Sequence, residues 1–257
     1  MDMDSVLLYK TAMLAGEIMA QSGAETFRVE DTMNRILRTS HYQMIEVHAT
    51  TTGIMATLSD PAAEPVTGVK RINNRANNLY RINEVNQISR DICDNRIDLN
   101  TAYEKLLEVK NKTIYTKRTI AIATVISAAG FAGLYGGNAA DCLVAGVNGI
   151  IIALIGLLNV RVRSTFMLDA VKSFILAVIT MACAYFTGWL HPEIVIIGSI
   201  MPLLPGIPIT NAIRDTLQGD YMSGTARAAE AFVISLGIAV GVGFGMGFFN
   251  MLERIFV

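Results

Sequence analysis

Five apolar stretches in the last 139 residues place the strongest limit on how this chain can fold. About 20 helical residues cross a bilayer, because its hydrocarbon core is about 30 Å thick and a helix rises about 1.5 Å per residue. Backbone groups in lipid must be hydrogen-bonded internally, and these stretches lack the alternation of barrel strands, so helices are predicted. The predicted transmembrane helices are approximately 119–135, 142–160, 168–190, 193–213 and 229–249.

The distribution of charge divides the chain into two parts. Residues 1–118 contain 30 Asp, Glu, Lys or Arg residues, whereas residues 119–257 contain only 13. We therefore expect a cytoplasmic domain over 1–118, followed by a transmembrane domain over 119–257. The net charge of −1 argues against a nucleic-acid partner, and the acidic N-terminus does not resemble a cleavable signal peptide.

Basic residues predict the orientation of the helices, because Lys and Arg are enriched in cytoplasmic loops. They precede the first predicted helix and lie between the second and third helices and between the fourth and fifth. The other two loops contain neither Lys nor Arg, so we expect the N-terminus in the cytoplasm and the C-terminus outside. The residues are Lys110, Lys112, Lys117, Arg118, Arg161, Arg163, Arg214 and Arg227, and only Arg254 opposes this orientation.

The fourth apolar stretch contains three prolines and a glycine within seven residues. Each proline removes an amide donor and clashes with the preceding turn, so we expect this helix to kink or break. In transporters, the half-helices of a broken span line a cavity, and their N-termini favour anionic groups. We expect the second half-helix to begin near Ile209 and to present Thr210 and Asn211 at a binding or gating site; an architectural kink is the alternative. The helix-breaking residues are Pro202, Pro205, Gly206 and Pro208.

A few other polar residues of the membrane half are candidates for substrate binding, gating or proton coupling. Asp169 and Lys172 are three residues apart, so they share a helix face and could pair or serve a transport path. Asn148 lies within the second predicted helix, where hydrogen bonding between helices is the simpler interpretation. Asp215 follows the fourth stretch, in a solvated loop or a gate.

Small residues recur at helical spacing in the membrane half. Gly237, Gly241 and Gly245 lie four residues apart in the fifth stretch, on one helix face. Such a stripe allows two helix backbones to approach closely. Ordinary helix packing and a sliding interface would both explain it.

The N-terminal half predicts a small α+β domain. Helical periodicity alternates with strand-like period-two runs, and the S-x-x-E sequence from Ser22 to Glu25 resembles a capping box that would open the second helix. The predicted helices are approximately 3–21, 25–39, 77–95 and 100–109, and the predicted strands are 45–50, 54–59 and 66–71.

Charged residues gather around the break between the first two helices. Paired carboxylates there could perform acid–base chemistry, although capping and solvated helix positions explain the same residues. The cysteines and histidines show no ligand spacing and His48 has no evident relay, so we expect no metal, cofactor or catalytic triad. The candidate residues of this region are Glu17, Gly23, Glu25, Arg28 and Glu30.

Two segments resemble signature regions of the threonine/serine exporter family. They are AGEIMAQSGAETFRVEDTM (15–33) and PLLPGIPITNAIRDTLQGDYMSGTARAAEA (202–231). The resemblance covers essentially the whole chain and implies a bacterial cytoplasmic-membrane exporter of small amino acids. Related split systems, which combine a five-span subunit with a smaller membrane partner, are associated with dicarboxylate (succinate) export. This chain is similar to the larger subunit of that type.

The resemblance and the spans together predict a non-enzymatic, secondary-type exporter subunit for a small carboxylate-bearing metabolite. No P-loop pattern is present in the sequence, so an ion or substrate gradient would supply the energy. One membrane half would need a second membrane subunit or a second copy, because transport sites commonly lie between two repeats. The alternatives are a membrane-tethered hydrolase centred on Glu17, Glu25 and Glu30, and a non-transporting regulatory membrane subunit.

Overall fold

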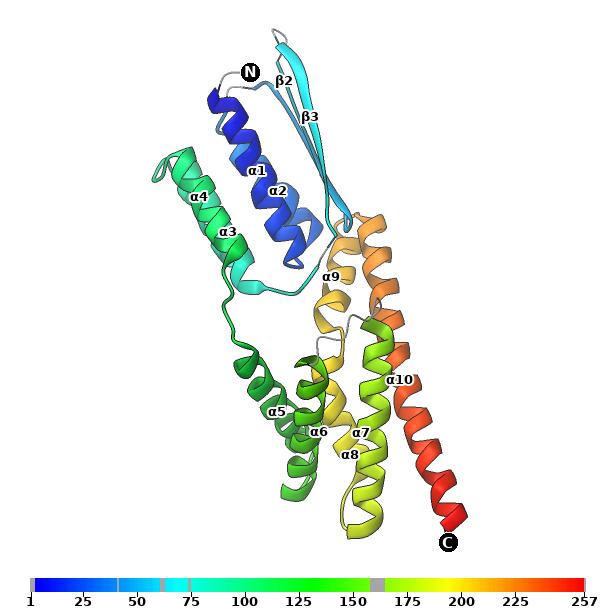
Figure 1. The fold of residues 1–257 in the computed structure, drawn as a ribbon. Helices are drawn as coiled ribbons and strands as arrows, with labels where there is room; N and C mark the ends of the chain where they lie inside the picture. The colour runs from blue at the N-terminus through cyan, green and yellow to red at the C-terminus, as the bar shows by residue number, and fades with distance from the viewer. Residues whose placement is uncertain (1–2, 41, 61–62, 74, 158–164, 257) are drawn as a thin grey trace. The chain divides into compact units, whose positions relative to one another are not determined.

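The computed structural model describes residues 3–40, 42–60, 63–73, 75–157 and 165–256 (Figure 1). The described chain is mostly helical and contains one small sheet, as expected. Its contacts define two compact units. The first comprises Met1–Lys112 with Gly206–Ala229, and the second comprises Thr113–Pro205 with Glu230–Val257.

The N-terminal part of the first unit has three layers: a sheet, a central pair of helices and an outer pair (Figure 1). The sheet is antiparallel with strand order β1-β2-β3, and the central helices contact it through α2 and β1 and through α1 and β2. The outer helices pack against the other side of the central pair. The elements are α1 (Met3–Gln21), α2 (Thr26–Leu37), β1 (Met44–Ala49), β2 (Gly53–Asp60), β3 (Ala63–Arg71), α3 (Leu79–Cys93) and α4 (Leu99–Asn111).

The core of these layers follows the predicted periodicities. In β2, the alternating residues Ile54, Ala56 and Leu58 are buried, as the period-two pattern requires of a strand with one covered face. They join a single cluster with apolar residues of all four helices. The helix contributions include Ile18, Met19, Met33, Ile36, Val85 and Leu106.

The predicted capping box at the start of α2 is wrong. Ser22 directly follows the last residue of α1, and its backbone N–H donates to the Ile18 carbonyl at 3.0 Å. Glu25 is itself the N-cap residue, and its side chain makes no capping hydrogen bond. Gly23 forms the sharp turn between the two helices with a φ of +78°, which only glycine adopts without strain.

The second unit consists of long apolar helices. Helix α8 contacts α5, α6 and α7. In the described residues, four helices are long and apolar enough to cross a membrane, or five if the interrupted fourth stretch is one span. The helices of this unit are α5 (Lys117–Leu134), α6 (Ala139–Leu157), α7 (Thr165–Thr187), α8 (Pro192–Ile200) and the greater part of α10 (Tyr221–Phe256).

The fourth apolar stretch is broken, as its prolines predict. Helix α8 is followed by a 3₁₀ turn, Met201–Leu203, and a new helix, α9, runs from Gly206 to Leu217. The predicted start near Ile209 is therefore three residues late. Pro208 lies in the first turn of α9, where backbone N–H groups have no partner within the helix, so it does not interrupt this helix.

Asp215 lies within α9 and is buried rather than in a solvated loop, and the segment after α9 is mostly helical. Only residues 218–220 separate α9 from α10, and Gly219 has a φ of +88° in this turn. Gly224 allows the two helices to approach closely, because a Cβ atom there would lie 2.3 Å from Thr216 Oγ1. Both α9 and the first turns of α10 belong to the first unit.

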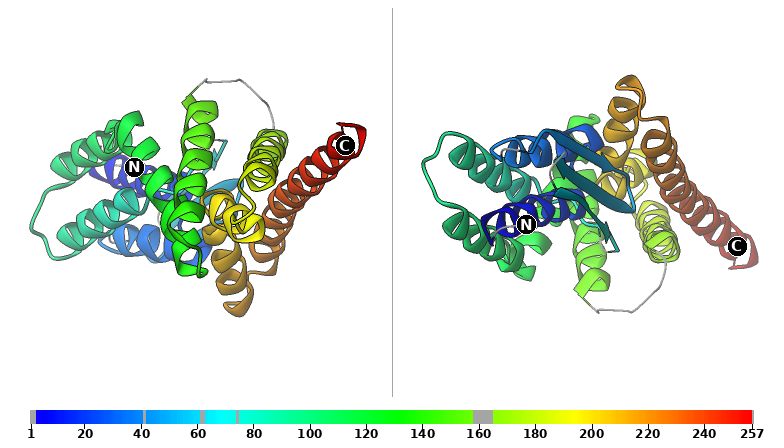
Figure 2. Two further views of the ribbon diagram at one scale, coloured as in Figure 1. Left: turned by 90° about the horizontal axis from the view of Figure 1, so that it is seen from below. Right: turned by 90° about the horizontal axis from the view of Figure 1, so that it is seen from above.

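The glycine stripe of α10 lies against α7, and the two helices run side by side in the second unit (Figures 1 and 2). A Cβ atom would lie 2.7 Å from the Phe166 ring at Gly237, 2.3 Å from the Ala170 carbonyl oxygen at Gly241, and 2.7 Å from the Phe174 carbonyl oxygen at Gly245. The stripe therefore forms a close helix–helix contact.

Candidate functional site

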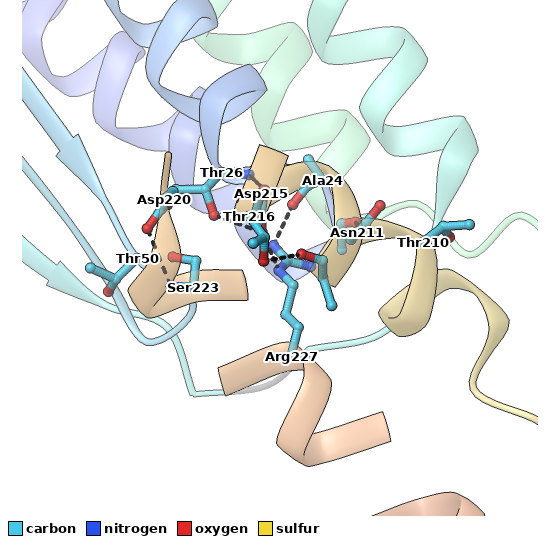
Figure 3. Close-up of polar contacts among 12 residues, drawn as sticks. Ala24, Thr26, Thr50, Thr210, Asn211, Asp215, Thr216, Asp220, Ser223 and Arg227 are labelled. Atoms are coloured by element: carbon cyan, nitrogen blue, oxygen red, sulfur yellow. Dashed lines mark hydrogen bonds and ion pairs between the residues drawn. The ribbon is translucent and has the colours of Figure 1, made fainter. Parts of the chain in front are cut away.

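The two segments that carry the family resemblance meet within the first unit. The turn between α1 and α2 contacts α9 and the start of α10, although the two parts are separated by about 190 residues (Figure 3). We call Ala24, Thr26, Asn211, Asp215 and Arg227 the Asp215 cluster.

Asp215 lies at the centre of this cluster and is fully buried. Its Oδ1 accepts a hydrogen bond from the Thr26 backbone N–H at 3.0 Å, and its Oδ2 accepts one from Thr26 Oγ1 at 3.2 Å. Thr26 is the first residue of α2, so Asp215 caps this helix from a distant part of the sequence. A carboxylate is favoured there, because a helix N-terminus carries partial positive charge.

Arg227 of α10 neutralises the Asp215 carboxylate. Its Nε lies 2.9 Å from Asp215 Oδ2 in an ion pair that is not aligned as a hydrogen bond. Its Nη2 donates to the Ala24 carbonyl at 2.7 Å, so one guanidinium contacts both α9 and the α1–α2 turn. The Arg227 side chain is only 11% exposed. The pair is therefore largely removed from water, where a charge is costly unless it is matched.

Two further residues of α9 contact the same turn. Asn211 Nδ2 donates to the Gly23 carbonyl at 2.8 Å, and Arg214 forms an ion pair with Glu25. Asn211 and Asp215 are four residues apart and thus on one face of α9. Arg28 also approaches Glu25, with Nε 3.6 Å from Oε2, but its side chain is largely exposed.

A cavity of about 300 Å³ lies beside the Asp215 cluster. Several of its lining residues were separate candidates in the sequence, and the structure brings them together on one surface of the first unit. They include Gly23, Glu25, Arg28, Thr210, Asn211 and Arg214.

The three carboxylates considered for acid–base chemistry have separate partners. Glu17 pairs with Lys110 at 3.0 Å, and Glu25 pairs with Arg214. Glu30 Oε1 accepts the backbone N–H of Ala49 at 2.8 Å. These are the contacts of structural ion pairs and hydrogen bonds, and they do not favour a shared acid–base site.

Five candidates from the membrane half lie in the second unit: Asn148, Asp169, Lys172, Pro202 and Pro205. Lys172 Nζ is 2.9 Å from Asp169 Oδ1. Asn148 is fully buried, and its Nδ2 donates to Thr180 Oγ1 at 2.9 Å and to Ser199 Oγ at 3.0 Å, which links α6 to α7 and α8. Pro202 and Lys172 line a second cavity. Pro205 is the last residue of this unit's first segment, and Gly206 and Pro208 belong to the first unit with α9.

Thr26 and Arg227 were not identified as site residues from the sequence. Arg227 was used only as an orientation signal, and Thr26 was one residue of a helix start. The sequence did contain one signal for these residues. Charged residues are scarce in the last 139 residues, and Asp215 and Arg227, on either side of the turn at 218–220, each need a partner to offset the cost of a charge there. Within the described residues, no three His, Cys, Asp or Glu side chains gather as a metal site.

Comparison with known proteins gives one family over nearly the whole chain. The family model described as "Putative threonine/serine exporter" matches residues 10–249. A Mycobacterium tuberculosis protein named "Probable threonine/serine exporter" is 25% identical over 228 residues, which cover 88% of this chain and 43% of that protein. This chain thus spans less than half the length of that relative.

Two shorter relatives match over most of their own length. The protein named "Probable succinate transporter subunit YjjP" in Escherichia coli is 23% identical over 232 residues, covering 88% of this chain and 89% of the relative. The protein of the same name in Klebsiella aerogenes is 23% identical over 229 residues, covering 87% of each. No solved structure matches this chain significantly.

Proposed function

This chain belongs to the threonine/serine exporter family, and we propose that it is the larger subunit of a two-part exporter for a small carboxylate-bearing metabolite. The family and the apolar helices make it a multi-pass protein of the cell membrane with a transport function. The proposal adds a substrate class, an orientation and a site.

The Asp215 cluster is the observation that carries the proposal. Helix α9 is the second half of the interrupted fourth stretch. Three of its residues contact the α1–α2 turn or the first residue of α2: Asn211, Arg214 and Asp215. Broken helices in transporters form substrate paths. If α9 moved, these contacts would either break or move the α1–α2 turn with the helix. The N-terminal domain would therefore sense or gate the path.

The proposed arrangement has residues 1–118 in the cytoplasm and five crossings within 119–257. The pattern of basic residues supports a cytoplasmic N-terminus and an external C-terminus in a bacterial cytoplasmic membrane. The interrupted fourth span would line the path, with backbone groups exposed by its helix-breaking residues. These residues are Pro202, Pro205, Gly206 and Pro208.

A second membrane component is part of the proposal. The Escherichia coli relative is named a transporter subunit, and the Mycobacterium tuberculosis relative is more than twice the length that this chain matches. A transport path between two repeats would therefore be completed by another membrane subunit or by a second copy of this chain.

The names of the relatives support two substrate classes, hydroxylated amino acids and succinate. Both contain a carboxylate. We infer a gradient-driven mechanism, since the sequence contains no P-loop pattern. The separate partners of Glu17, Glu25 and Glu30 favour this function over a membrane-tethered hydrolase.

Export from cells tests the proposal. Cells that produce the chain with its partner should release more threonine, serine or succinate than cells that lack it. Asn211→Ala removes the hydrogen bond to the Gly23 carbonyl and should lower export while membrane insertion is retained. Gln218→Ala, in the exposed turn after α9, is the control and should export normally.

Unchanged levels of all three metabolites in cells without the chain would show that the substrate class is wrong. An unchanged export rate in Asn211→Ala would remove Asn211 from the working site.

A further inference from the structure

A second cavity lies in the second unit, at the 3₁₀ turn that interrupts the fourth apolar stretch. Its volume is about 280 Å³, below the roughly 300–1,000 Å³ typical of pockets for drug-sized ligands. Pro202 and Leu203 form its wall on the side of the turn, and α5, α6 and α7 contribute the rest. The cavity has the size for a small metabolite.

Two lysines line this cavity. Lys172 of α7 is only 12% exposed and lies within a predicted transmembrane helix, where an ionisable residue is costly and commonly functional. Asp169 holds its ammonium group at 2.9 Å. Lys117 at the start of α5 is exposed and forms no ion pair within the described part of the chain.

The charge balance of the cavity is therefore positive. Two ammonium groups face one neighbouring carboxylate, and no acidic residue is among the described residues that line the cavity. An anion would supply the missing negative charge in a partly desolvated site, where charge-assisted hydrogen bonds are strong.

The cavity also has free space at its α6 side. Gly156 is a lining residue, and a Cβ atom built there meets no described atom within 4 Å. A larger side chain at this position would therefore fill the cavity without pressing on the backbone.

We propose that this cavity binds a small dicarboxylate, with one carboxylate near Lys117 and the other near Lys172. A zwitterionic amino acid fits less well, because its ammonium group would face two lysines and an aspartate that is already paired. The inference rests on the proposed export function for its role in transport, but it concerns binding by this chain itself.

The test is equilibrium binding of radiolabelled succinate to the purified full-length protein in detergent, with threonine as a competitor. Lys117→Gln should weaken succinate binding about tenfold or more, since a charged hydrogen bond contributes about 1.5–3 kcal/mol. Gly156→Leu should weaken it at least as much by filling the cavity. A large excess of threonine should displace little succinate.

Two matched controls keep the test specific. Lys105→Gln makes the same charge change on the exposed side of α4, outside the cavity, and should bind normally. Gly130→Leu makes the same size change in α5, where a Cβ atom also meets nothing within 4 Å, and should bind normally. Because Lys117 has no ion-pair partner among the described residues, its replacement should leave the fold intact.

Succinate that fails to bind the unmodified protein, or binds equally to Lys117→Gln and Gly156→Leu, overturns the proposal. If threonine displaces succinate at concentrations similar to those at which unlabelled succinate does, the selectivity for dicarboxylates is overturned. Transport is measured separately: succinate binding without flux would contradict export while leaving the site intact, and flux without the predicted loss of binding would contradict the site alone.

Discussion

At the scale of single residues, Asp215 serves as a helix cap for a segment about 190 residues earlier in the chain. It satisfies the first N–H of α2, which Ser22 and Glu25 fail to do, and its charge is matched by Arg227. This arrangement explains why the sparse charges near the end of the fourth stretch are tolerated.

Replacement of Asp215 by asparagine should destabilise the protein strongly. The amide can still accept the Thr26 N–H, but Arg227 would remain largely buried without a counter-charge. Removal of one partner of a buried ion pair costs about 3–5 kcal/mol. Thermal unfolding of the purified protein in detergent should show a clearly lower midpoint.

Asp220→Asn is the matched control for this prediction. Asp220 is less buried and accepts the Ser223 N–H at 3.2 Å, a capping role that asparagine fills equally well. The double variant Asp215→Asn/Arg227→Met should recover part of the lost stability. A melting midpoint for Asp215→Asn equal to that of Asp220→Asn would contradict the role assigned to the ion pair.

At the scale of elements, sequence periodicity predicted most helices and strands but not where α9 begins. The three prolines indicated a break, and the break is present after α8. The predicted start near Ile209 lies one residue after Pro208. A proline in the first turn loses no hydrogen bond, so α9 begins at Gly206.

The glycine stripe of α10 gives a prediction at this scale. Gly241→Ala should lower thermal stability by about 1–3 kcal/mol, because the added methyl group would overlap the Ala170 carbonyl oxygen of α7. Melting in detergent measures the effect.

Gly243→Ala is the control two residues away, since a Cβ atom there meets nothing within 4 Å. Equal melting temperatures for the two variants would show that α7 and α10 do not approach as closely as described.

At the scale of the whole molecule, the charge distribution indicated two parts, and the contacts add a detail that composition cannot supply. Residues 206–229 share a compact unit with residues 1–112. Periodicity reports on neighbours within a helix or strand, whereas the pairing of Thr26 with Asp215 depends on tertiary packing. The family resemblance marked both segments as important, but it did not indicate that they touch.

The candidate residues fall into two groups, one in each unit. Gly23, Glu25 and Asn211 belong to the contact around Asp215, whereas Pro202 and Lys172 line the cavity of the second unit. Asn211, Pro202 and Lys172 were candidates because such residues are scarce in an apolar region, whereas Gly23 and Glu25 were candidates because charged residues gather around the first helix break. Only the fold shows that Arg227 belongs to the first group and that Lys117 lines the same cavity as Lys172.

Efflux from proteoliposomes measures export by the purified protein itself. Vesicles would contain the purified chain, alone and together with the proposed second membrane subunit, and would be loaded with radiolabelled succinate or threonine. We expect efflux above that of empty vesicles when the path is complete, with a lower rate for Asn211→Ala. No efflux of either substrate under either condition would contradict an export function and would favour a non-transporting membrane subunit.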